Sequence, residues 1–175
     1  KPIGLGEPLV VERKAYDATT RLDILVMLKN PNPDWWLPSS QVTASVFDAE
    51  GTIIATDNNF VTVPPGDEVA FILTGIDIAD KTYDAIEVDL TPKEMRPLST
   101  WPNAAVEVVQ SSLVGDNIVG QVENVGEVEI PQTKVVAVIR DATGEAMGID
   151  FTYADESQPG QVVPFELSLL GLEET

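Results

Sequence analysis

Asp48-Ala49-Glu50-Gly51 returns 93 residues later as Asp141-Ala142-Thr143-Gly144. In both places an Asp that can start a turn precedes a Gly that tolerates positive φ, between two apolar runs. Three further landmarks recur in the same order at an offset of 94: Asn30 and Asn124, Pro65-Gly66 and Pro159-Gly160, and Phe71 and Phe165. This self-similarity marks a duplicated unit of about 90 residues and predicts two copies of one architecture.

The chain between the turns alternates with a period of two, and β-branched residues dominate most of the alternating runs. Leu22, Ile24 and Val26, for example, fall on one face of an extended segment. Short strands separated by frequent turns favour a sandwich over a parallel sheet with helices. The sequence thus predicts an all-β fold of two tandem immunoglobulin-like antiparallel β-sandwiches, with one helical turn conceivable between Ile76 and Tyr83. The expected strands are 9–15, 21–29, 41–48, 52–60, 68–74, 85–90, 104–111, 117–124, 134–141, 146–153 and 161–169.

The predicted organisation is a first domain over 1–92, a linker over 93–103 and a second domain over 104–175. The linker contains prolines, which make it stiffer than a Gly/Ser tether. Trp101 within it is expected either to pack between the two domains, or to be exposed or docked on one of them. The last strand of the first domain, Tyr83–Leu90, has no counterpart, because the equivalent would begin at 177, past Thr175. Three interpretations stay open: an open edge, residues 167–172 serving as that strand, or a native chain that continues.

The composition limits the partners. The net charge is −19, with 29 Asp and Glu against 10 Lys and Arg, and the acidic residues are spread over both repeats. Such a charge repels phosphate backbones and anionic lipid, so nucleic acid and membrane surfaces are poor partners. No apolar run approaches the length of a membrane helix, which is about 20 residues. Because the chain begins at Lys1 instead of Met, we expect that an N-terminal segment, such as a signal peptide or a lipid anchor, was removed.

The landmarks resemble the FxLYD family of small immunoglobulin/fibronectin-III-like domains. The second repeat carries Gly120-Gln-Val-Glu-Asn124-Val-Gly126, Ile139-Arg-Asp141, Pro159-Gly160 and Phe165 for this pattern. Both repeats depart from the family pattern. Its leading Phe is Ala44 in the first repeat and Ala137 in the second, and its Tyr is Phe47 in the first and Arg140 in the second. Asn30-Pro-Asn-Pro33 also resembles the domain of late-embryogenesis and water-stress proteins. Both resemblances imply a β-sandwich in which the motif residues are structural, and neither implies a catalytic site.

Catalytic and metal chemistry lack their usual residues. The chain has no Cys and no His, so an enzyme would need paired carboxylates, and most Asp and Glu fall in turns or on outward strand positions. No phosphate-binding glycine loop is present; Gly4-Leu-Gly6 lacks a strand–helix context. Asp57-Asn58-Asn59 and Asp155-Glu156 are the densest oxygen clusters for calcium, and neither has the spacing of a dedicated loop. We expect no enzyme activity, no cofactor and no metal site.

Trp35-Trp36 is the most distinctive local feature, predicted to lie in a loop between two strands of the first repeat. Adjacent residues of an extended chain point in opposite directions, so one indole can fill the core edge while the other faces out. One interpretation is packing under the loop or against Trp101. The other is a ligand or partner contact made by Trp35, Trp36 and Asp34, because an exposed indole can stack on a sugar or anchor a protein.

These observations favour a non-catalytic structural or interaction module, extracellular or at the cell surface, that presents binding surfaces on two rigid sandwiches. The alternative is a carbohydrate- or cell-wall-binding module that uses Trp35 and Trp36. The partner is expected to be a protein or a glycan, and a weak dimer through strand edges is a further expectation.

Overall fold

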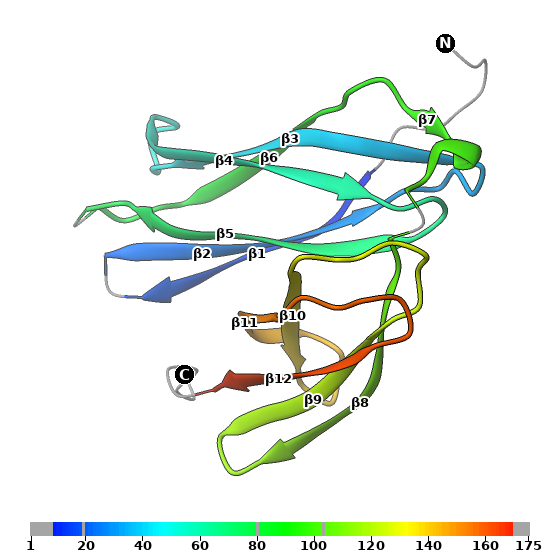
Figure 1. Cartoon of the computed structure of the whole chain (residues 1–175). Helices are drawn as coiled ribbons and strands as arrows, with labels where there is room; N and C mark the ends of the chain where they lie inside the picture. Colours follow the sequence, from blue (N-terminus) through cyan, green and yellow to red (C-terminus); the bar gives the residue numbers. More distant parts are fainter. Residues whose placement is uncertain (1–8, 19, 80, 103, 170–175) are drawn as a thin grey trace. The chain divides into compact units, whose positions relative to one another are not determined.

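The computed structural model describes residues 9–18, 20–79, 81–102 and 104–169 (Figure 1). The chain divides into two compact units, Lys1–Thr100 (unit 1) and Trp101–Thr175 (unit 2). All sheets are antiparallel, and the described residues hold no α-helix, only the 3-10 turn η1 (Leu98–Thr100). The fold is therefore all-β, as the sequence predicts.

Unit 1 consists of two sheets. One has the order β1-β2-β5 and the other β4-β3-β6, with the short β7 pairing with the start of β3. The two sheets form separate layers in Figure 1. The strands are β1 (Leu9–Ala18), β2 (Arg21–Lys29), β3 (Trp35–Phe47), β4 (Ile53–Val63), β5 (Glu68–Asp77), β6 (Ala85–Thr91) and β7 (Arg96–Pro97).

The core of unit 1 lies between these sheets. The predicted row of β2 is fully buried, and the alternating row Val42, Ala44 and Val46 of β3 is fully buried opposite it. Burial of a Val or Leu side chain stabilises the folded state by about 1.5–3 kcal/mol. From β6, Ile86, Val88 and Leu90 pack against the same core, because they pair with Val46, Ala44 and Val42.

Unit 2 repeats most of this plan. Its sheets are β12-β9-β8 and β10-β11, formed by β8 (Val106–Val114), β9 (Asn117–Asn124), β10 (Thr133–Arg140), β11 (Ala146–Ala154) and β12 (Val162–Ser168). A smaller core of Val122, Ala154, Val163 and Phe165 joins them. Gly120 is required there, since a Cβ at this position would lie 2.4 Å from Phe165 Cζ and 2.6 Å from the Gln110 carbonyl oxygen.

One buried asparagine joins the same two connections in each unit. The Asn30 amide donates to the carbonyls of Trp35 and Pro64 at 2.7 and 2.8 Å, and the Asn124 amide donates to Val128 and Ser157 at 2.8 and 2.9 Å. Both side chains are fully buried. An amide can satisfy two carbonyls at once, which explains why this polar residue recurs inside an apolar sandwich.

The Asp-x-x-Gly turns are also equivalent. Asp48 Oδ1 accepts hydrogen bonds from the backbone N–H groups of Glu50 and Thr52, and Asp141 Oδ1 accepts them from Thr143 and Glu145. Gly51 and Gly144 have φ of 77° and 89°, a region that favours glycine. The duplicated landmarks are thus turn and core parts.

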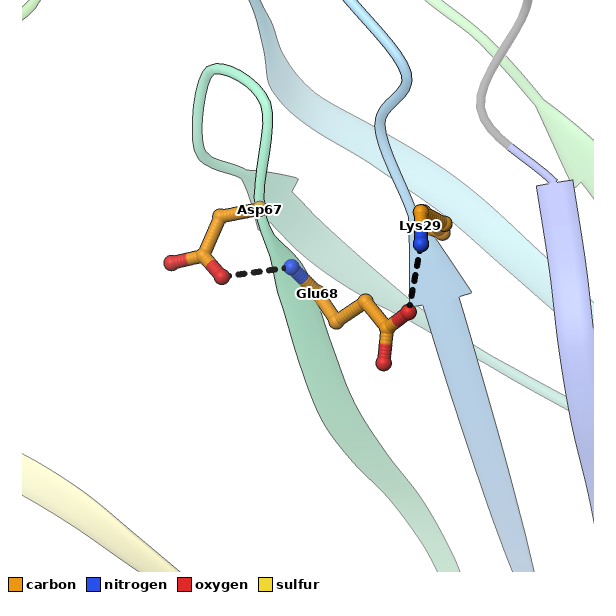
Figure 2. Close-up of polar contacts among 3 residues, drawn as sticks. All are labelled: Lys29, Asp67 and Glu68. Carbon is orange, nitrogen blue, oxygen red and sulfur yellow. Dashed lines mark hydrogen bonds and ion pairs between the residues drawn. The ribbon is translucent and has the colours of Figure 1, made fainter. Parts of the chain in front are cut away.

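A surface ion pair closes the β2–β5 ladder beside the Asn30 loop. Lys29 Nζ lies 3.1 Å from Glu68 Oε1, and the Glu68 backbone N–H donates to Asp67 Oδ1 at 2.7 Å (Figure 2). Because both side chains are about half exposed, such a pair contributes only about 0.2–1 kcal/mol.

Three local expectations are wrong. The strand predicted over 41–48 begins at Trp35, because its first residues pair with β7 and β4. The stretch 76–83 shows no helical turn among its described residues; the 3-10 turn lies at Leu98–Thr100 instead. Residues 93–100 of the predicted linker belong to unit 1, where β7 pairs with β3.

Candidate functional site

Trp35 and Trp36 start β3 and do not lie in a loop. Trp36 is 7% exposed, and its Nε1 donates to Thr100 Oγ1 at 3.1 Å. The Arg96 guanidinium carbon lies 5.5 Å from the centre of the Trp36 ring, within the range of a cation–π contact. Trp36 therefore holds residues 96–100 against β3 within unit 1, and this indole has a structural role.

Trp35 is only half-buried and lines a groove of about 540 Å³. Lys93, Glu94 and Arg96 add charged groups to the same groove, and Pro38, Met95 and Pro97 complete it. Asp34 is exposed, and its carbonyl accepts the Leu98 N–H at 2.7 Å. Asn30 and Asn32 are buried and bonded to each other, at 2.9 Å from Asn32 Nδ2 to Asn30 Oδ1, so they do not face this groove as ligand donors.

Trp101 is the first residue of unit 2. Its predicted role between the domains stays a prediction. The same holds for a partner contact made by Asp34 and Trp35.

The strongest difference between the units lies at the edge of β10. In unit 1, β3 has β4 on one side and β6 and β7 on the other. In unit 2, among the described residues, β10 pairs only with β11. Residues 167–168, which were one candidate for the missing strand, belong to β12 and pair with Ile118 and Asn117 of β9; residues 170–172 of that candidate lie outside the described part.

An unsatisfied hydroxyl marks this edge. Thr133 Oγ1, at the start of β10, is buried without a hydrogen-bond partner. Leu37-Pro38-Ser39-Ser40 and Ile130-Pro131-Gln132-Thr133 align at the offset of the Asp-x-x-Gly turns, which makes Ser40 the counterpart of Thr133. Ser40 Oγ donates to the Pro38 carbonyl at 2.7 Å and accepts the Lys93 N–H at 2.9 Å. Sequence reasoning missed Thr133, although this aligned tetrapeptide could have indicated it.

Among the side chains that the structure describes, which do not include those of β1, large exposed apolar groups are more frequent on unit 2. Among the large hydrophobic residues exposed in the described part of the chain, unit 1 contributes Ile53, Phe60 and Leu98. The others lie on unit 2, and four of them are on the edge strand β8, where Leu113 is 67% exposed. The remaining residues of this set are Val108, Val109, Val114, Val125, Val128, Met147, Tyr153 and Val162.

Two ionisable groups near β10 have shifted pKa values. Hydrogen bonding to the Thr143 side chain, followed by the Glu145 backbone N–H, lowers the pKa of Asp141. Burial lowers the pKa of Lys134, whose Nζ lies 4.0 Å from the centre of the Phe151 ring. Both shifts have local structural causes.

Within the described ranges, no three His, Cys, Asp or Glu side chains gather where they could hold a metal ion. In the same part of the chain, no helix is long and apolar enough to cross a membrane.

Comparison with known proteins does not assign a family. No family model matches the chain, and no curated protein matches it. Among solved structures, it is similar to the crystal structure of red sea bream transglutaminase, with a TM-score of 0.33 and 17% sequence identity. That match covers 90% of this chain and 26% of the other, so the chain spans about a quarter of the length of that structure. A similarity at this level supports no inference about activity.

Proposed function

We propose that the chain is a non-catalytic interaction module, extracellular or at the cell surface, whose immunoglobulin-like β-sandwiches present surfaces to a polypeptide partner. The observation that carries the proposal is the apolar surface of unit 2, above all on β8. Exposed apolar side chains are unfavourable in water, and a concentration of them on one element typically marks an interaction surface. The resemblance to the FxLYD family supports the same class of function, because its motif residues here, such as Asn124 and Asp141, serve turns and core.

The test compares peptide and glycan ligands on the same chain. A displayed library of random peptides and an array of glycans and cell-wall fragments are both screened with the full chain. We expect saturable peptide binding that Leu113→Asp weakens, because a carboxylate on β8 opposes apolar contact. Ser112→Asp, next to it on the same strand, is a charge-matched control. Glycan binding without peptide binding, or turnover of a bound ligand, contradicts the proposal.

The alternative is a carbohydrate-binding module, and the half-buried Trp35 beside its groove favours it. An indole that lines an open groove with charged neighbours can stack on a sugar ring. Trp35→Ala is the informative variant, since Trp36→Ala removes a buried side chain and perturbs folding. Loss of glycan binding in Trp35→Ala, with an unchanged unfolding midpoint, supports this alternative. Binding that is insensitive to Trp35→Ala excludes it.

A further inference from the structure

We infer that the open edge of β10 accepts an extended strand of another polypeptide, antiparallel to β10, in which apolar residues alternate with carboxylates. This rests on the proposed function and names the place and the chemistry of the partner. Unit 1 provides the template, because β6 pairs with β3 in this way within the same chain.

Within the described residues, the core of unit 2 is incomplete at this edge. Val42, Ala44 and Val46 are fully buried in unit 1, where β6 pairs beside them, whereas their counterparts Val135, Ala137 and Ile139 are only partly buried. A strand that places apolar side chains opposite these three residues would complete the layer, as Leu90, Val88 and Ile86 do in unit 1. Pairing at an exposed edge also satisfies backbone N–H and C=O groups.

The hydroxyl of Thr133 fixes where such a strand would end. Ser40, its counterpart, accepts the N–H of Lys93, which lies two residues beyond the end of β6. A partner as long as residues 85–93 can therefore bring a backbone N–H to Thr133 Oγ1. A buried hydroxyl without a hydrogen-bond partner destabilises the folded chain, so an incoming N–H donor is favourable there.

Charge selects an acidic partner and disfavours a second copy. Lys134 and Arg140 are exposed at the two ends of β10, on the outward row, although Arg140 Nη1 also donates to the Gly144 carbonyl at 3.0 Å. In the register of β6, Asp89 and Glu87 would lie diagonal to these two cations. Two β10 strands paired around Ala137 would instead place Lys134 opposite Arg140, which is a like-charge pair.

The first experiment uses a fluorescent synthetic peptide with the sequence of residues 83–93 and the full-length chain. We expect saturable binding by anisotropy, and none with a shuffled peptide that lacks the apolar alternation. Lys134→Glu should weaken binding about tenfold, because attraction becomes repulsion across the strands. Lys81→Glu, an exposed charge reversal in unit 1, should leave binding unchanged. Equal effects of both reversals contradict the inference.

Thr133→Val separates a binding role of this hydroxyl from a structural role, because the two roles predict different effects on stability and on peptide binding. The variant should leave the free chain as stable as the parent or more stable, and should weaken peptide binding. Ser40→Ala, at the satisfied counterpart, should lower the unfolding midpoint of unit 1. A Thr133→Val variant that destabilises the chain as Ser40→Ala does overturns the role assigned to this hydroxyl.

A tethered strand allows binding to be detected even when the affinity of the free peptide for β10 is low. Residues 83–93 are added after Thr175 through a flexible Gly/Ser linker, which raises the effective concentration of the strand at β10. We expect a higher unfolding midpoint for unit 2 than with a shuffled tether, and an unchanged midpoint overturns the inference.

A concentration-dependent dimer of the free chain that Lys134→Glu abolishes would assign the edge to a second copy. Polypeptide binding that responds to Leu113→Asp alone would refute the β10 edge and leave the proposed function standing.

Discussion

Asn30 and Asn124 show how one side chain can determine the path of a loop. Each places its amide between two backbone carbonyls from different connections, one just after its own strand and one 33 or 34 residues further along the chain. The backbone N–H of each asparagine bonds to the residue just before β5 or β12, Asp67 or Gln161. A hydrocarbon at this position would leave both carbonyls buried without donors. The asparagine therefore recurs for a structural reason.

Replacement of either asparagine tests this role. Asn30→Ala and Asn124→Ala should each lower the free energy of unfolding of their own unit by about 1–3 kcal/mol, because buried carbonyls lose their donors. Urea denaturation measures the loss. Asn58→Ala, at an exposed position of β4, is the control and should change stability by less than about 0.5 kcal/mol. Equal effects of all three substitutions would contradict the assignment.

Asp141 gives the stability of unit 2 a pH dependence. The pKa of this carboxyl is lowered from 3.8, first by the Thr143 side chain and then by the Glu145 backbone N–H. A carboxyl with a depressed folded-state pKa stabilises the fold above its unfolded pKa, and this stabilisation disappears as the pH falls through the folded pKa. The difference in unfolding midpoint between the parent and Asp141→Asn should therefore be larger at pH 7 than at pH 2.5. A difference that does not vary with pH argues against this linkage.

Residues whose hydrogen-bond partners lie close in sequence could be predicted. Asp48, Asp141 and their glycines form the expected turns because every partner lies within four residues. The unsatisfied hydroxyl of Thr133 was not predictable from its own surroundings. It is recognised only by comparison with Ser40 in the other copy, whose hydroxyl accepts a hydrogen bond from a residue 53 positions away.

Among the elements, β3 shows how a neighbouring segment extends a strand. Its alternation predicts a strand over residues 41–48, but Trp35 and Trp36 join the strand because β7 pairs with them. A two-residue strand inside a proline-rich stretch has no periodicity to detect, so the same stretch was expected to be a linker. Most other strands follow the predicted ranges, since both faces of each are patterned by their own residues.

The attachment of β7 depends on Trp36. Trp36→Phe retains most of the apolar area but removes the Nε1 donor to Thr100. We expect a loss of about 0.5–1.5 kcal/mol in the stability of unit 1, together with faster trypsin cleavage after Lys93, because the Arg96–Pro97 bond itself resists trypsin. Limited trypsin digestion followed by mass spectrometry measures the cleavage. Trp35→Phe is the matched control, and equal sensitivity of the two variants would contradict a special role for Trp36.

For the whole molecule, the two units differ in how much core they bury. The core cluster of unit 1 contains thirteen buried hydrophobic residues among the described part, and that of unit 2 contains four. We expect unit 2 to unfold at a lower urea concentration, because less apolar surface stabilises it. Hydrogen exchange with mass spectrometry assigns each transition to its strands. Loss of β2 and β3 protection before that of β9 and β12 would contradict this order.

The duplication of the scaffold could be predicted from sequence, whereas the open edge could only be suggested. The repeat landmarks indicate the strands that both copies share. They do not indicate which edge of β10 lacks a neighbouring strand, because that depends on sheet order and register, which the structure supplies.

Amide exchange in β10 tests the central claim most directly. In β3, between β4 and β6, the amides of residues 41–47 should all be protected, whereas in β10 only the amides that face β11 should be. NMR-detected hydrogen exchange on the full chain should therefore show protection at alternate residues of 133–140, with the intervening amides exchanging about 100-fold faster or more. Uniform protection along β10, matching that of β3, would show that this edge is already paired and would contradict the account.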